Sequence, residues 1–185
     1  MNKYVHALLC GANSLIKFSL LKFECGNKFK CNWVNLVSPL TEITVDKGGE
    51  LKIGKTFRMR SGSKLRVRKN AKVCIGKNFS MSNNCVITSW EKIDIGNNVQ
   101  FGPGVLIYDQ DHDVNVPGGL AAEKYKTKPI KIGNNVWIGA NSVILRGTYI
   151  GDNSVIGAGS IIKGEIPSGS LLVQKRENVI RELYK

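Results

Sequence analysis

The sequence is poor in the residues on which many metal and disulfide sites depend. Its 185 residues include only two histidines, His6 and His112, and its five cysteines are odd in number and form no Cys-x-x-Cys pair. Zinc sites need several closely spaced Cys or His ligands, so we predict no metal site. Scattered cysteines favour a reducing compartment, where Cys acts as a small apolar filler. We therefore expect a cytoplasmic protein.

Aromatic residues and long apolar runs are also scarce. Aromatic residues make up 8% of the chain, so the core is expected to be aliphatic. We expect no membrane-spanning helix, which would need a run of roughly 18–20 apolar residues. The start of the chain superficially resembles a signal peptide, but His6 interrupts its short apolar stretch and Leu9 precedes Cys10 where a lipoprotein signal needs a small residue. We therefore expect no cleavage there.

Acidic residues are rare in the first part of the chain. Residues 1–80 hold 16 Lys/Arg and 4 Asp/Glu, whereas residues 81–185 hold 11 and 10. This asymmetry indicates either a polyanionic partner, such as an acidic polymer or an anionic membrane surface, or exposed lysines that maintain solubility. Nucleic acid is disfavoured as a partner because the basic part has few aromatic residues on which bases would stack.

A six-residue repeat is the dominant pattern. From Ile132 the chain runs IGNNVW, IGANSV, ILRGTY, IGDNSV, IGAGSI and IKGEIP, and earlier copies begin at Ile53, Ile75 and Ile95. A period of six fits the strand period of two and not the helical period of 3.6. The repeat predicts a parallel β-helix in which three hexads make one triangular coil. The first and fifth residues face a narrow interior, so the fifth must be small, and Gly or Asn occupies corners that often need positive φ.

The repeat is interrupted once and has different ends. Between Ile107 and Ile130 the period breaks, so residues 113–129 are expected to leave the coil as a long loop of the kind that is usually functional. We expect three parts: an N-terminal amphipathic helix and connector (1–30), the β-helix (31–170) and a C-terminal tail or short helix (171–185). The helix is expected to cap the exposed strand edges of the first coil, with peripheral contact to the inner membrane surface as the alternative.

The sequence resembles the hexapeptide-repeat acyltransferases over residues 45–183. The similarity is strongest in GVLIYDQDHD and in PIKIGNNVWIGANSVILRGTYIGDNSVIGAGSIIKGEIPSGS. The most similar branch O-acetylates sugars, including capsule and O-antigen saccharides, and galactoside, maltose and serine acetyltransferases are related to it. The resemblance implies a left-handed parallel β-helix, acetyl-CoA as co-substrate with no metal, and a homotrimer with each active site between adjacent subunits.

The implied reaction is acetyl transfer from acetyl-CoA to a saccharide hydroxyl. The basic first part of the chain favours an anionic or lipid-linked saccharide. The alternatives are N-acetylation of an amino-sugar nucleotide, O-acetylation of a small free acceptor such as a drug, sugar or serine, and a non-enzymatic scaffold. The resemblance makes His112 the general base that takes the hydroxyl proton, a role that suits an imidazole with an ordinary pKa of about 6.5. Relatives often carry a second histidine where Gln110 stands. Asp111 or Asp113 is a candidate to orient the imidazole, although an extended segment would point both away from it.

Three further residues are expected near the acceptor. The resemblance places Asn84 against the acceptor or the acetyl group, with a corner asparagine as the alternative. Trp137 must face outward because Val136 and Ile138 occupy the interior, so it either stacks in the cleft or packs against the loop. Asp109 is a candidate contact to the acceptor sugar.

Coenzyme A is expected along the later coils. Ala140 and Ala158 match the small residues that lie beside the pantetheine arm in the family. Basic residues near the C-terminus are candidates to contact the CoA phosphates, although the sequence departs from the family pattern there: Lys163, Lys175, Arg176 and Arg181.

Overall fold

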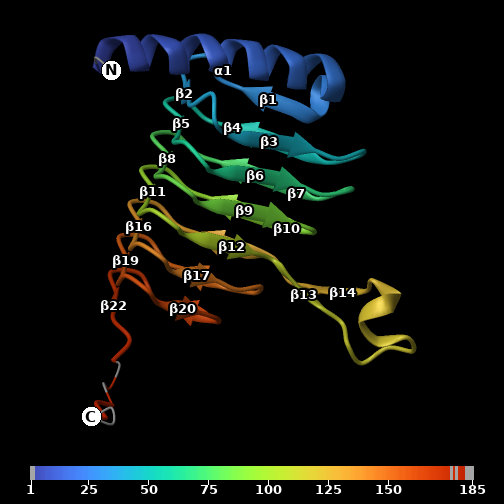
Figure 1. The fold of residues 1–185 in the computed structure, drawn as a ribbon, viewed down its shortest axis with the longest axis vertical. Helices are drawn as coiled ribbons and strands as arrows, with labels where there is room; N and C mark the ends of the chain where they lie inside the picture. The colour runs from blue at the N-terminus through green and yellow to red at the C-terminus, as the bar shows by residue number, and fades with distance from the viewer. Residues whose placement is uncertain (1–2, 176, 178, 182–185) are drawn as a thin grey trace.

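The structure is a computed structural model that describes residues 3–175, 177 and 179–181. A long helix, α1 (Lys3–Cys25), and a short 3-10 helix, η1 (Gly26–Lys28), precede a stack of β-strands, and α1 lies across one end of the stack (Figure 1). Successive strands pass in turn to three parallel sheets, here called A, B and C, so that each set of three strands makes one coil. The predicted parallel β-helix is confirmed, with six complete coils and a partial seventh.

The sheets form the three sides of the coil, and every strand in them pairs in parallel with the strand one coil away. Sheet A consists of β1 (Phe29–Cys31), β4 (Glu50–Ile53), β7 (Lys72–Ile75), β10 (Lys92–Ile95), β15 (Ile130–Ile132), β18 (Tyr149–Ile150) and β21 (Glu165–Ile166). Sheet B consists of β2 (Leu36–Val37), β5 (Arg58–Met59), β8 (Ser80–Met81), β11 (Gln100–Phe101), β16 (Trp137–Ile138), β19 (Val155–Ile156) and β22 (Leu171–Leu172). Sheet C consists of β3 (Glu42–Val45), β6 (Lys64–Val67), β9 (Val86–Ser89), β12 (Leu106–Tyr108), β17 (Val143–Ile144) and β20 (Ile161–Ile162). The described residues beyond β22 contain no helix and form a tail.

The coils near the N-terminus are longer than the repeat predicts. Lys131 pairs with Tyr149, which lies three hexads later as expected. In contrast, Leu51 pairs with Val73, which lies further along the chain than three hexads reach. The reason is that the strands of sheets A and C are longer in this part of the stack, as in β4 and β6. Only the later coils therefore consist of three hexads.

The interior confirms the inward positions of the hexad but not the predicted size limit. The fifth residues of the later hexads, such as Val136 and Ser154, are buried as predicted. At the same position of earlier hexads the chain places Phe57 and Phe79, which are fully buried and stacked with their ring centroids 5.6 Å apart. Phe79 also contacts Phe101 edge-on at 4.9 Å. The longer coils thus hold a column of aromatic rings where small residues were expected.

Asparagines at positive φ form the corner between sheets A and B. Asn78, Asn98, Asn135 and Asn153 have φ between 54° and 59°. Their side-chain amides bond from one coil to the next: Asn78 donates to Asn98 at 2.9 Å, Asn98 to Asn135 at 2.8 Å and Asn135 to Asn153 at 3.0 Å. Asparagine tolerates the left-handed conformation better than other non-glycine residues, which explains its choice at these corners.

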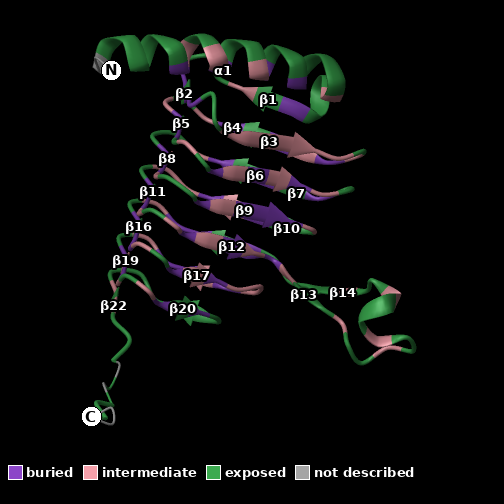
Figure 2. Ribbon diagram, in the orientation of Figure 1, coloured by how far each residue is buried: buried purple, intermediate pink, exposed green. Residues whose placement is uncertain are grey.

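The helix α1 caps the first coil, but it does so with polar side chains. Asn13 donates to the carbonyl oxygens of Val37 (2.9 Å) and Ser38 (3.2 Å), and Ser14 donates to that of Asn35 at 2.8 Å. Lys17 donates to the backbone oxygen and to the hydroxyl of Thr41. These bonds satisfy carbonyl groups at the open end of the coil, where no further strand follows. The apolar residues at helical spacing, which the amphipathic pattern would turn toward the coil, all remain exposed (Figure 2): Val5, Leu8, Leu9, Ala12, Ile16, Leu20 and Phe23. Phe18 and Leu21 are buried instead.

Candidate active site

The predicted loop is an arm that extends from the corner between sheets C and A (Figure 1). It contains an antiparallel pair of strands, β13 (Gln110–His112) and β14 (Tyr125–Thr127), joined by a segment with the 3-10 helix η2 (Gly119–Ala122). The chain leaves the coil at Asp109 and returns at Lys128, whose N–H donates to the carbonyl of Asp109 at 3.0 Å. His112 therefore lies on a strand of the arm, and the excursion begins before residue 113.

Asp109 is the anchor at the base of the arm. Its side chain is fully buried. One carboxylate oxygen accepts a hydrogen bond from the hydroxyl of Ser89 (2.7 Å) and from the N–H groups of Glu91 (3.0 Å) and Lys92 (2.8 Å). The other accepts from the N–H of Trp90 at 2.6 Å. This burial contradicts the predicted contact of Asp109 with the acceptor, because its oxygens already bind the turn that leads into β10.

His112 is exposed and rests against an aromatic partner from the other strand of the arm. His112 and Tyr125 are paired across β13 and β14, and their ring centroids are 4.7 Å apart. Tyr125 in turn stacks on Trp90 with 4.0 Å between centroids and 30° between ring planes. The three rings form a ladder from the coil to the histidine, here called the aromatic ladder. The imidazole nitrogens have no hydrogen-bond partner among the described residues, so they are available to a substrate.

The two flanking aspartates are paired with cations and not with the histidine. Asp111 accepts a hydrogen bond from Arg146, in the turn after β17, at 2.5 Å. Asp113 lies 2.9 Å from the ammonium of Lys126, which holds the pKa of that carboxyl below its usual range. Neither carboxylate contacts His112, because alternate residues of an extended strand point to opposite faces. In this geometry neither carboxylate orients the imidazole, and the side chain that lies against it is the ring of Tyr125.

Gln110 lies on the same face of β13 as His112, because alternate residues of a strand share a face. Its side-chain oxygen is buried and has no hydrogen-bond partner among the described residues.

The other predicted acceptor residues lie on different sides of the coil. Trp137 is exposed on β16 of sheet B, and its outward orientation agrees with the prediction. Asn84 is at the corner between sheets B and C with φ of 59°, the corner position named as its alternative. The arm with His112 leaves from the corner between sheets C and A. A single chain therefore does not bring His112 and Trp137 to one face.

The predicted CoA residues fall into two groups. Ala140 and Ala158 lie one above the other in consecutive coils, at the corner between sheets B and C. A side chain on Gly139 would approach the backbone of Ala158 to 2.5 Å, so the chain at this corner packs closely. Lys163 and Lys175 are exposed, Arg181 lies in the tail, and Arg176 falls outside the described residues. The tail is tied to sheet C by Gln174, which bonds both backbone groups of Ile161.

Sequence reasoning missed Tyr125, Trp90 and Arg146. Tyr125 and Trp90 are distant from His112 along the chain, at separations that match no local period. The available signal was the Pro117-Gly118-Gly119 stretch, which is typical of a turn and indicates that the flanking segments return antiparallel to one another.

Known proteins with the same repeat are similar to this chain. A family profile described as "Bacterial transferase hexapeptide (six repeats)" matches residues 129–164. Galactoside O-acetyltransferase of Escherichia coli (strain K12) is 42% identical over 106 residues, which cover 57% of this chain and 52% of the relative. A putative lipopolysaccharide biosynthesis O-acetyl transferase of the same organism is 26% identical over 115 residues, which cover 57% and 58%. The chain thus spans about half the length of the curated relatives that it matches.

Among solved structures, a variant of an N-acyltransferase from Bacillus cereus in complex with dTDP and coenzyme A has a TM-score of 0.66 with this chain. The two are 21% identical, and the match covers 89% of each chain. At this level of identity the likeness concerns the fold.

Proposed function

We propose that this chain, which belongs to the hexapeptide-repeat transferase family, transfers an acetyl group from acetyl-CoA to a hydroxyl of a saccharide. The observation that carries the proposal is the exposed imidazole of His112, which lies against Tyr125 on the arm and has its nitrogens free of partners among the described residues. The names of its relatives, a galactoside O-acetyltransferase and a putative lipopolysaccharide O-acetyl transferase, support a sugar acceptor. Within that class we favour a capsule, O-antigen or exopolysaccharide sugar.

In the proposed reaction His112 acts as the general base. A nitrogen of the imidazole accepts the proton of the acceptor hydroxyl while the oxygen attacks the thioester carbonyl carbon. The C–S bond then breaks, the acetyl ester forms, and the imidazolium returns its proton to the CoA thiolate. A positioned general base contributes about 10²–10⁴-fold to such a step. Acetyl-CoA is the second substrate, and the five free cysteines agree with a reducing, cytoplasmic setting.

We propose in addition that each active site is shared between copies in a homotrimer. His112 and Trp137 lie on different sides of one chain, so a site that contains both requires a second copy. The exposed apolar side chains of Val114 and Leu120 on the arm support such a contact. Co-expression of His112→Ala and Trp137→Ala chains tests this, because mixed trimers contain some sites with both residues intact. We expect partial recovery of activity relative to either variant alone, and no recovery would contradict a shared site.

N-acylation of an amino sugar is the second candidate, because the solved N-acyltransferase from Bacillus cereus shares the fold over most of the chain. The test is thiol release from acetyl-CoA in the presence of a capsule or O-antigen preparation, free sugars, or nucleotide-linked amino sugars. Hydroxyl acceptors are expected to give the product, and a response to amino sugars alone would favour the second candidate.

The role of His112 is tested with the same assay. His112→Ala is expected to fold normally, because the side chain is exposed, and to lose acetyl transfer by about 10²-fold or more while still binding CoA. Lys124→Ala, an exposed change elsewhere on the arm, is the control and is expected to keep full activity. Full activity in His112→Ala would exclude the general-base role.

A further inference from the structure

The outward face of α1 is apolar over almost its whole length. Leu8, Ile16 and Phe23 are 74%, 62% and 89% exposed, and they are joined on this face by other exposed apolar side chains: Val5, Leu9, Leu15 and Leu20. The exposed residues between positions 5 and 20 include no Asp, Glu, Lys or Arg. An apolar surface of this kind marks a contact with another molecule or a membrane.

The helix cannot turn this face inward. Asn13, Ser14 and Lys17 bond the carbonyl groups of residues 35–41 at the open end of the first coil. Contact with the coil also lowers the pKa of Lys17, because burial disfavours its charged form. Rotation of the helix would break these bonds and leave buried carbonyl groups without donors. The apolar face is therefore a fixed feature of the outer surface at this end of the molecule.

The segment Tyr4–Lys28 is long and apolar enough to cross a membrane by length and composition only, a test that core helices and signal sequences also pass. The structure nevertheless holds α1 flat across the coil, with Phe18 and Leu21 buried against it. A helix of 23 residues in this position presents a strip about 35 Å long. Its geometry corresponds to a helix that lies in the membrane surface, not to one that spans it.

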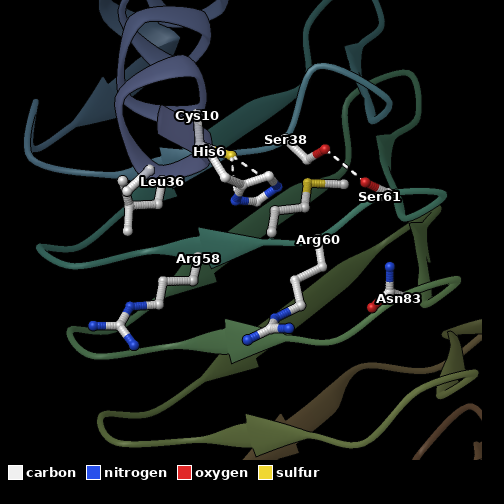
Figure 3. Close-up of a pocket in the computed structure, with 10 residues that line it drawn as sticks. His6, Cys10, Leu36, Ser38, Arg58, Arg60, Ser61 and Asn83 are labelled. Carbon is white, nitrogen blue, oxygen red and sulfur yellow. Dashed lines mark hydrogen bonds between the residues drawn. The ribbon is translucent and has the colours of Figure 1, made fainter. Parts of the chain in front are cut away.

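Positive charge lies under α1, on the coil side of the helix. Arg58 of β5 and Arg60 of the turn after it lie side by side in the second coil, below the helix (Figure 3). Neither side chain has a partner among the described residues. Together with His6 they line a pocket of about 240 Å³ under the N-terminal half of α1. The acids of the neighbouring coils do not offset this charge, because each is already paired with another cation: Glu42 with Arg66, Asp46 with Arg68 and Glu50 with Lys72.

We propose that α1 docks this protein on the surface of an anionic phospholipid bilayer, with its apolar face in the lipid and the Arg58–Arg60 pocket facing the headgroup phosphates. The occupant is assigned from charge complementarity. Anionic lipids attract basic groups over roughly the Debye length, about 10 Å at 0.1 M ionic strength. Apolar burial and charge attraction act together in binding of this kind. The inference does not depend on the proposed acetyl transfer.

Sedimentation with vesicles tests the proposal. The full-length protein is expected to bind vesicles of phosphatidylglycerol and phosphatidylcholine, and to bind pure phosphatidylcholine vesicles more weakly. The triple variant Leu8→Ser/Ile16→Ser/Phe23→Ser should bind the anionic vesicles at least about tenfold more weakly, because it removes apolar area from the lipid. Arg58→Gln/Arg60→Gln should reduce the preference for anionic vesicles and its sensitivity to salt. Leu171→Ser/Val173→Ser, exposed apolar positions at the opposite end, is the matched control and should bind as the wild type does.

Three results would overturn the proposal. One is a wild-type protein that stays in the supernatant with anionic vesicles, and another is a triple variant that binds them equally well. The third is a wild-type protein that does not bind vesicles but self-associates in light scattering, with the self-association lost in the triple variant. That result would assign the face to a second copy of this chain. Circular dichroism is expected to show all variants folded, because each substituted side chain is exposed. Acetyl transfer to a dissolved acceptor is expected to persist in the triple variant whether or not vesicle binding is found.

Discussion

The imidazole of His112 lies against the ring of Tyr125 with 4.7 Å between ring centroids, and Tyr125 stacks on Trp90 with 4.0 Å between centroids. Trp90 follows β9 of sheet C, so the ladder connects the histidine on the arm to the coil. The ring planes are inclined by 41° between His112 and Tyr125 and by 30° between Tyr125 and Trp90. The imidazole nitrogens have no hydrogen-bond partner among the described residues. In this arrangement the position of the base is set by aromatic packing, whereas the charged neighbours Asp111 and Asp113 are bound to cations on the other face of the strand.

Tyr125 is expected to act as a positioning residue for His112. Tyr125→Ala removes the middle ring of the ladder, and we expect kcat to fall by about tenfold with little change in the KM for acetyl-CoA, because a misplaced base slows proton transfer. Tyr125→Phe keeps the ring and should retain activity within about threefold of wild type. Steady-state kinetics of both variants provide the check. Equal losses in the two would assign the effect to the hydroxyl and not to stacking.

The aspartates beside His112 are expected to matter little for catalysis. Asp111→Asn and Asp113→Asn each break a partly exposed ion pair that contributes roughly 0–1 kcal/mol to stability. We expect kcat/KM to stay within about threefold of wild type. A loss of 100-fold in either variant would restore that carboxylate as the group that orients His112.

The same pairing predicts the pH profile. Lys126 lowers the pKa of Asp113, so the ion pair is present above the ordinary Asp value and is lost as pH falls through the folded value. Asp113 therefore remains ionised above pH 5. The acidic limb of kcat/KM, measured between pH 5 and 9, should be the same in Asp113→Asn as in wild type. A shift of that limb in the variant would show that Asp113 titrates with the base.

Replacement of Asp109 is expected to destabilise the arm and the coil below it. Asp109→Ala leaves the N–H groups of Trp90, Glu91 and Lys92 without their acceptor inside the protein. Buried donors that lose a charged acceptor cost about 3 kcal/mol or more in total. Urea unfolding should show a clear fall in the transition midpoint. The exposed change Asp111→Asn serves as the control, and a midpoint unchanged in Asp109→Ala would contradict the anchoring role.

The corner asparagines Asn78, Asn98, Asn135 and Asn153 are expected to stabilise the corner between sheets A and B in two ways, through their amide hydrogen bonds and through their tolerance of positive φ. Asn98→Ala removes two amide bonds and places a less tolerant residue at φ of 56°, for a loss of about 2 kcal/mol. Asn98→Gly removes the same bonds but accepts positive φ, so it should lose about 1 kcal/mol less than Asn98→Ala. Thermal unfolding distinguishes the two. Equal stability of the Ala and Gly variants would show that φ does not contribute.

The local pattern of the chain was sufficient to predict the coil. Alternation along a strand and positive φ at a corner are properties of a few neighbouring residues, so the hexads from Ile132 to Ile166 indicate which side chains are buried and where Asn135 and Asn153 turn the chain. The place of His112 on an excursion followed from the break in the period. The assignment of a base to His112 came from the resemblance to a family and remains a proposal.

The tertiary structure alone decided which groups meet. Asp109 binds the turn at 89–92, and Tyr125 reaches both His112 and Trp90, because the arm folds back on a coil whose residues are distant in sequence. The wider early coils, which admit Phe57 and Phe79, depend on extra residues in strands that no single hexad displays. The orientation of α1 is the clearest case. Periodicity shows that the helix has an apolar and a polar side, but the unpaired carbonyl groups at the open coil end require the polar side, and that requirement exists only once the coil has formed.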